Sequence, residues 1–202
     1  SPAPEFHATF AAGKILRHAL VAELGGEPDV QARCACDICD AHVEHSEVLR
    51  GMRRSRFCAI ASSNAQSSRR LTEAVLSGCI PVFFGAPWHA LPLAQHVDWG
   101  AMALFLQVED DRAWVDHASP RWERNALSLK VWALDPAARP LVQKVPTLRD
   151  ALSLLRNVSD ERLRGMQRSL DAQKFKFYYP ALPHWAPPLP RSQRLDAILA
   201  DA

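Results

Sequence analysis

The pattern of apolar and polar residues divides the chain into short segments that predict alternating strands and helices. Apolar runs at 55–61, 79–84 and 103–108 are typical of short buried strands. Between the first two runs, residues 69–77 carry apolar positions at helical spacing, and Gly78 is suited to end that helix. The strand–helix–strand order predicts a βαβ unit, and hence an α/β fold with a mostly parallel sheet and helices on both faces.

Four further segments, at 14–24, 43–54, 147–156 and 159–175, show the spacing of amphipathic helices. The last two are the clearest, because each begins with a hydroxyl residue that can cap it. In the second strand, Pro81 lacks a backbone N–H. The pairing of that strand is therefore either interrupted at Pro81 or confined to an edge of the sheet.

The segmentation predicts one domain over residues 1–179 and a proline-rich tail with a short helix over 180–202. Hydrophobic residues make up 48% of the 202 and charged residues 23%, which supports a packed core and excludes global disorder. The net charge of +2 is too small to favour nucleic acid as a partner. No apolar run is long enough to span a membrane, and a chain that starts at Ser1 is expected to be a processed or excised piece.

The chain has five cysteines, at positions 34, 36, 39, 58 and 79. The first three, together with His42 and His45, have a spacing that fits either disulfides in a luminal loop, one of them reaching Cys58, or a zinc site. Cys58 and Cys79 lie in apolar strands and are interpreted as buried small hydrophobic residues. Asn157 begins an N-glycosylation triplet, which together with the cysteines favours a secretory lumen.

Ligands of open parallel sheets bind beyond the carboxyl ends of the strands, which places a site at the loop 62–68 and the following helix. The free N–H groups at a helix N-terminus suit phosphate. Ser67 and Ser68 add hydroxyl donors there, and Arg69 and Arg70 add positive charge. The loop holds no glycine, so it is neither a P-loop nor a dinucleotide fingerprint.

Glu73 follows Arg70 by three residues, so the two share one face of the helix. Its carboxylate is able to accept both hydroxyls of a ribose, and the segment would then bind the diphosphate and the sugar of one nucleotide. The alternative is an ordinary surface ion pair with a helix cap. Trp88 and Trp99 lie near this segment and suit either stacking on a sugar or core packing.

Several segments together resemble the exostosin-type glycosyltransferases. The matching residues are Ser55-Arg56-Phe57-Cys58, Arg70-Leu71-Thr72-Glu73-Ala74, Gly78-Cys79-Ile80-Pro81-Val82, Leu91-Pro92-Leu93 with Trp99, and Val145-Pro146-Thr147-Leu148. The resemblance is specific over 55–108 and looser to about 179, and Leu93 stands where the family pattern has Phe.

The resemblance implies the donor-binding half of an inverting GT-B enzyme, a type II membrane protein of the Golgi lumen. Such an enzyme transfers a sugar from a UDP-sugar to a glycan or glycoprotein acceptor. By this resemblance Arg70 contacts the diphosphate, Glu73 contacts the ribose, and Gln66, Ser67 and Ser68 line the phosphate side with Arg69 beside them. It implies no metal and no other cofactor.

The chain has little room for the N-terminal acceptor domain of a GT-B enzyme, and any membrane anchor would lie outside it. The catalytic base is expected in the missing half, so no residue is assigned to that role. Two alternatives stay open: a nucleotide-sugar or glycan-binding module without turnover, and an interaction module built on the cysteines and histidines.

Overall fold

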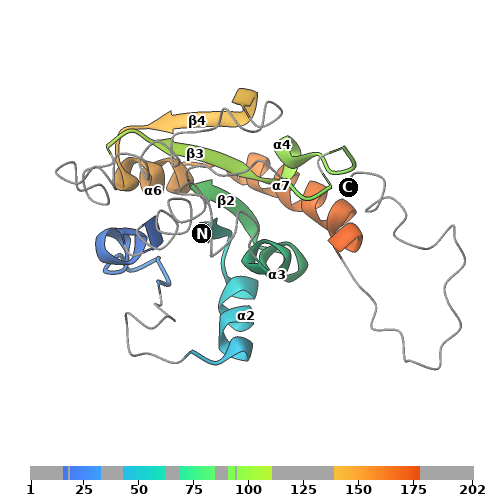
Figure 1. The fold of residues 1–202 in the computed structure, drawn as a ribbon, viewed down its shortest axis with the longest axis horizontal. Coiled ribbons are helices and arrows are strands. Elements are labelled where there is room, and N and C mark those ends of the chain that lie inside the picture. Colours follow the sequence, from blue (N-terminus) through green and yellow to red (C-terminus); the bar gives the residue numbers. More distant parts are fainter. Residues whose placement is uncertain are drawn as a thin grey trace, which may run out of the picture.

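The computed structural model describes residues 16–17, 19–32, 43–61, 69–84, 91–93, 95–110 and 139–177. Within these residues four strands form one parallel sheet in the order β1-β2-β3-β4 (Figure 1). The strands are β1 (Phe57–Ile60), β2 (Ile80–Phe84), β3 (Leu104–Val108) and β4 (Val142–Val145). The α/β class is confirmed, and the first three strands lie within the three predicted apolar runs.

The structure adds a strand that the sequence pattern did not indicate. Strand β4 has only four residues, and Val145 alone among them is buried. It carries polar and charged side chains between its two valines, so it shows neither a continuous apolar run nor a long alternation. Its pairing with β3, from Phe105↔Val142 to Val108↔Val145, makes it a strand.

Pro81 lies in an interior strand, because β2 pairs with β1 on one side and with β3 on the other. The N–H of Ile80 donates to the carbonyl of Arg56 just before β1, so the next nitrogen, that of Pro81, faces the β3 side. There the pairing begins only at Val82↔Leu104. Of the two expectations for Pro81, the edge strand is wrong; the pairing with β1 continues through Pro81, and the pairing with β3 begins one residue after it.

Apart from a short helix at residues 99–102, which was not predicted, the helices agree closely with the predicted segments. Residues 16–17 and 19–24 are helical, and the other helices are α2 (His45–Arg54), α3 (Arg69–Ser77), α4 (Trp99–Met102), α6 (Leu148–Arg156) and α7 (Asp160–Gln173), with short 3-10 turns η2 (Arg139–Leu141) and η3 (Lys174–Phe177). Helix α6 begins with a capping box between Thr147 and Asp150, and the Ser159 hydroxyl caps α7.

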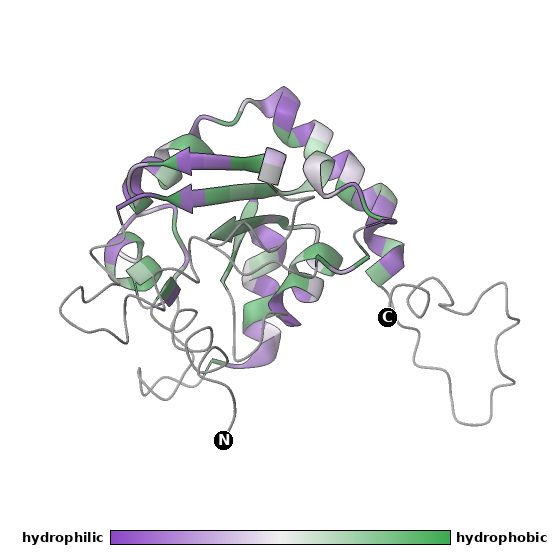
Figure 2. Ribbon diagram, turned by 45° about the horizontal axis from the view of Figure 1, so that its top comes forward, coloured by the Kyte–Doolittle hydropathy of each residue, from purple (hydrophilic) through white to green (hydrophobic). Residues whose placement is uncertain are grey.

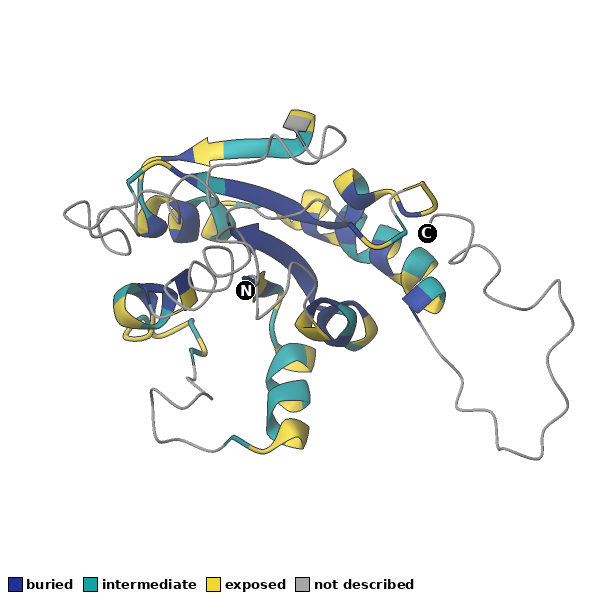
Figure 3. Cartoon of the chain, viewed as in Figure 1, coloured by how far each residue is buried: buried dark blue, intermediate teal, exposed yellow. Residues whose placement is uncertain are grey.

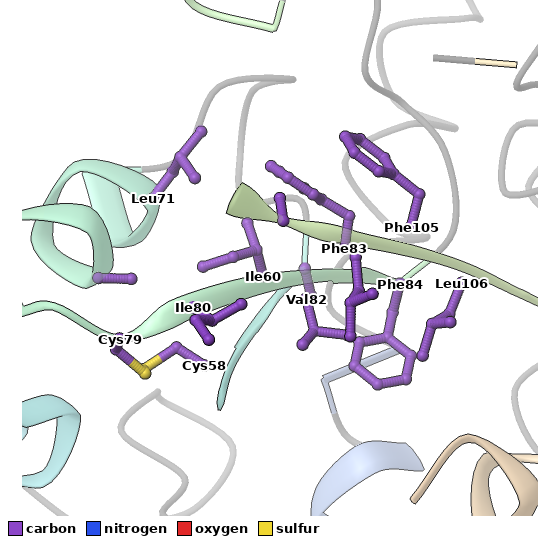
Figure 4. Packing of buried hydrophobic residues seen from close by; sticks show 14 of the residues in the cluster. Cys58, Ile60, Leu71, Cys79, Ile80, Val82, Phe83, Phe84, Phe105 and Leu106 are labelled. Atoms are coloured by element: carbon purple, nitrogen blue, oxygen red, sulfur yellow. A yellow bond between two sulfur atoms is a disulfide. The ribbon is translucent and has the colours of Figure 1, made fainter. Parts of the chain in front are cut away.

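Apolar side chains from both faces of the sheet are buried against helices, which confirms the expected two-faced arrangement. On one face Phe83 stacks on Phe105 with 4.7 Å between ring centroids, and Trp99 packs edge-on between Phe83 and Phe177. Figure 4 shows Phe84 and Leu106 on the opposite side. In Figures 2 and 3 the interior strands are hydrophobic and buried, while the outward sides of the helices are polar. Trp99 is thus a core residue.

Cys58 and Cys79 form a disulfide, with 5.7 Å between their Cα atoms (Figure 4). Both residues are buried as expected, but their interpretation as unlinked hydrophobic residues is wrong, and so is a disulfide between Cys58 and a loop cysteine. The register of β1 on β2 pairs Cys58 with Pro81, and Cys79 immediately precedes β2, two residues before that partner. Only strand pairing brings the two thiols within bonding distance.

Candidate functional site

Helix α3 carries the three described members of the predicted site on one face near its N-terminus. The guanidinium Nη1 of Arg70 donates to Oε2 of Glu73 at 2.9 Å. The Nε of Arg69 lies 2.8 Å from Oε1 of the same carboxylate. The structure therefore brings Arg70 and Glu73 together, as the sequence spacing predicted, and adds Arg69 to the same carboxylate.

Glu73 is the buried member of this group, with only 8% of its surface exposed. Among the described residues it is the one charged or polar residue that is buried. The core face of α3 is formed by Leu71, Ala74 and Val75, and helical geometry puts Glu73 on the other side of the helix. A carboxylate in that position is normally solvated. The ion pair expected as an alternative is present between Arg70 and Glu73, but its carboxylate is buried rather than at the surface.

One oxygen of this buried carboxylate has no hydrogen-bond partner among the described residues. Oε1 of Glu73 is fully covered, and although Arg69 lies beside it as an ion pair, the Nε–H of Arg69 does not make a hydrogen bond with it. A buried acceptor without a donor costs about 1–3 kcal/mol, more when it is charged. Oε1 of Glu73 thus lacks a hydrogen-bond donor, and a hydroxyl group of a ligand is the kind of donor that would supply this bond.

His45 is the residue of this site that sequence reasoning assigned elsewhere. It is the first residue of α2, which packs beside α3 (Figure 1), and its Nε2 lies 3.6 Å from Oε1 of Glu73. Its side chain is 48% exposed, so it forms the rim of the site. The spacing of the cysteines and histidines at 34–45 grouped His45 with possible zinc ligands instead. No feature of the sequence indicates its contact with Glu73, which follows 28 positions later.

The C-terminal end of α3 is fixed by backbone hydrogen bonds and by the disulfide. Gly78 follows the helix with φ of +77°, a conformation that favours glycine, and its N–H and that of Cys79 bond back to the carbonyls of Val75 and Ala74. The disulfide then ties Cys79 to β1. The helix that carries Glu73 is therefore anchored to two adjacent strands by its C-terminal end.

Other predicted residues lie outside the described part of the chain. These are Gln66, Ser67 and Ser68 of the phosphate side, the cysteines at 34, 36 and 39, Trp88, and the short helix of the tail.

The described residues contain no group of three or more His, Cys, Asp or Glu side chains that could hold a metal ion. Asn157 is exposed between α6 and α7, where the glycosylation triplet was expected to lie.

A parallel sheet with helices on both faces, and a polar cluster on its first crossover helix, defines an α/β domain of the kind that forms half of a GT-B glycosyltransferase. The chain belongs to the exostosin GT47 domain family, whose model matches residues 6–118. The resemblance read from the motifs is thereby confirmed.

The relatives point to the same family. The chain is 29% identical over 124 residues to an exostosin-1 homolog of Caenorhabditis elegans, a match over 61% of this chain and 26% of that protein. It is 39% identical over 72 residues to a probable glucuronosyltransferase of Oryza sativa subsp. japonica, covering 35% and 17% of the two chains. A probable glycosyltransferase of Arabidopsis thaliana is 34% identical over 59 residues, covering 29% and 12%.

The chain thus spans about a quarter or less of the length of these relatives. No solved structure matches it. Among the described helices, none combines the length and the apolar character needed to cross a membrane.

Proposed function

We propose that this chain is the donor-binding part of an inverting glycosyltransferase that uses a nucleotide sugar, in particular a UDP-sugar. The observation that carries the proposal is the buried Glu73, which has one oxygen without a hydrogen-bond donor and lies beside two arginines at the start of a crossover helix. The family and the glycosyltransferase names of the relatives support it.

The proposed chemistry follows from the charges in this site. The nucleotide diphosphate lies against Arg70, Arg69 and the N-terminus of α3, and the Glu73 carboxylate accepts hydroxyl protons of the ribose. An acceptor hydroxyl attacks the anomeric carbon from the face opposite the diphosphate, and the bond from that carbon to the phosphate oxygen breaks. The arginines stabilise the negative charge that develops on the departing nucleoside diphosphate. A base outside the described residues takes the proton of the acceptor hydroxyl.

The acceptor side belongs to a separate part of the protein in this proposal. In a GT-B enzyme the acceptor domain faces the donor domain, and the matches with this chain cover only 26% and 17% of the length of two relatives. The acceptor, a glycan or glycoprotein, and the catalytic base are therefore assigned to that other domain.

The proposed location is the Golgi lumen, with the enzyme held as a type II membrane protein by an anchor outside this chain. The Cys58–Cys79 disulfide supports a compartment of this kind, because disulfides persist in the oxidising secretory pathway and are rare in the cytosol.

Calorimetric titration of the chain with UDP tests the donor site. Arg70→Ala and Glu73→Met are each expected to weaken UDP binding by about 1–3 kcal/mol, the scale of lost charge-assisted hydrogen bonds. Arg164→Ala and Glu161→Met change exposed residues of α7 and serve as matched controls that leave the affinity unchanged. Unchanged affinity in both site variants would overturn the placement of the site.

The second candidate function is a nucleotide-sugar-binding module without turnover. Transfer of a labelled sugar by the full-length protein separates the two: labelled product supports the enzyme, and UDP binding with no transfer and no hydrolysis supports the module.

A further inference from the structure

Two different elements place a carboxylate oxygen and an imidazole nitrogen side by side at the rim of the candidate site. Oε1 of Glu73 comes from the middle of α3, and Nε2 of His45 comes from the first turn of α2, 3.6 Å away. The distance is too long for a hydrogen bond between them. The pair is therefore able to bond a third group that lies in front of the two atoms.

A pair of neighbouring hydroxyls on a five-membered sugar ring suits this arrangement. One hydroxyl donates to the carboxylate oxygen, and the adjacent one reaches the imidazole nitrogen, because two acceptors 3.6 Å apart match groups carried by adjacent ring carbons. A carboxylate only accepts hydrogen bonds, and a neutral imidazole has one nitrogen that accepts. A methylene in place of either hydroxyl would leave an acceptor without a donor.

A ligand can reach His45 directly, whereas Oε1 of Glu73 is fully covered and becomes accessible only when a neighbouring side chain moves. His45 is about half exposed, and the Arg69 side chain, whose Nε lies 2.8 Å from Oε1, is 77% exposed. Arg69 makes only an ion pair with Glu73, without a hydrogen bond, so it is able to turn toward a phosphate group when a ribose hydroxyl takes its place.

We propose that His45 is the second acceptor for the ribose diol, and that Glu73 and His45 together make the site selective for ribonucleotides over deoxyribonucleotides. This inference rests on the proposed nucleotide-sugar function and adds a residue from α2 to its binding site. A site built to bond a hydroxyl discriminates strongly against an analogue that lacks it, because its buried polar groups are then left unpaired.

The competing explanation is structural: His45 merely accompanies the Glu73 charge and helps α2 pack on α3. The two explanations predict different behaviour. A structural histidine affects the stability of the fold and affects every nucleotide equally, whereas an acceptor for a hydroxyl changes the ratio of affinities for nucleotides that differ in that hydroxyl.

The test is calorimetric titration of the chain with UDP, 2′-deoxy-UDP and 3′-deoxy-UDP. The unmodified chain is expected to bind UDP at least about 10-fold more tightly than one or both deoxy analogues. His45→Ala is expected to weaken UDP binding about 3- to 10-fold, the scale of one hydrogen bond, and to reduce the preference for ribose over the corresponding deoxyribose. His45→Gln restores part of both effects because its amide oxygen accepts a hydrogen bond.

Ser46→Ala, at the neighbouring exposed position of α2, is the control and leaves all three affinities unchanged. If UDP binds and Glu73→Met weakens it, but His45→Ala leaves the ribose preference intact, the role of His45 is overturned and the donor site stands. The role of His45 is likewise overturned if His45→Ala lowers the melting temperature without changing the ratio of the affinities for UDP and its deoxy analogues. If the unmodified chain does not bind UDP, the proposed function and this inference both fail.

Discussion

Two clusters of acidic and basic side chains lie in different parts of the molecule. They differ in whether every carboxylate oxygen accepts a hydrogen bond. In the first, the Glu73 cluster (His45, Arg69, Arg70 and Glu73), the acid is buried and one of its oxygens has no hydrogen-bond donor. The second, the Arg156 cluster, consists of Glu27, Asp29, Arg149 and Arg156 and is largely exposed.

In the Arg156 cluster every carboxylate oxygen receives an N–H. Arg156 donates from Nε to Oδ2 of Asp29 at 2.9 Å, and from Nη2 to Oδ1 of Asp29 and to Oε2 of Glu27. Arg149 completes the set through its Nη1, 3.1 Å from Oε1 of Glu27. The cluster fastens the turn after the first helix to α6, across more than 120 residues of sequence.

The difference between the clusters suits two different roles for acidic and basic side chains, a structural contact and a ligand-binding site. The exposed cluster joins distant segments and leaves no acceptor without a donor, as expected of a purely structural contact. In the Glu73 cluster only the acid is buried, and because one of its oxygens lacks a hydrogen-bond donor the cluster contributes little to stability. Binding sites commonly carry such a loss of stability, because a ligand supplies the missing partner.

The largest expected effect concerns the disulfide that anchors the Glu73 cluster. Replacing both Cys58 and Cys79 by alanine is expected to lower the free energy of unfolding by about 3 kcal/mol, since the bond closes a loop of 21 residues. Urea denaturation measures the loss. The unmodified chain treated with a reductant under the same conditions is the control, and it should show a similar loss. Equal stability of the variant and the unmodified chain would show that strand pairing alone anchors α3.

The next effect compares the two acids directly. Glu73→Met removes a buried carboxylate with an unpaired oxygen, so the free energy of unfolding should stay the same or rise by up to about 2 kcal/mol. Glu27→Met should lower stability, because Arg156 and Arg149 lose a bonded partner, and should leave UDP binding intact. Urea denaturation together with UDP titration checks both variants. A clear destabilisation by Glu73→Met would mean that its cluster is structural as well.

The smallest expected effect is a pH dependence of the Arg156 cluster. Hydrogen bonds from Arg156 lower the pKa values of Glu27 and Asp29, so their contribution to stability is complete above the ordinary carboxyl pKa and is lost as the pH falls through the lowered values. The unmodified chain should melt slightly above Arg156→Gln at pH 7, and the gap should close below about pH 4. Thermal melts across this range measure it. A gap that is constant with pH would assign the effect to packing of the Arg156 side chain.

Much of the local structure was predictable because its causes are local. Helix α3 covers the same residues, 69–77, that the apolar spacing indicated, and the cap of α6 at Thr147 follows from its own first turn. The i,i+3 spacing also placed Arg70 beside Glu73 correctly. Strand β4 was not predicted, because its identity depends on pairing with β3 rather than on a pattern of its own.

The sequence by itself determined which segments fold, the family to which the chain belongs, and which charged groups share the first turns of α3. Only the tertiary structure decided that Glu73 is buried, that Cys58 reaches Cys79, and that His45 stands at the edge of the site. The physical reason is the range of the interactions involved. Helical spacing and capping act within one turn of chain, whereas burial, disulfide pairing and contacts between helices depend on how the strands and helices pack against one another.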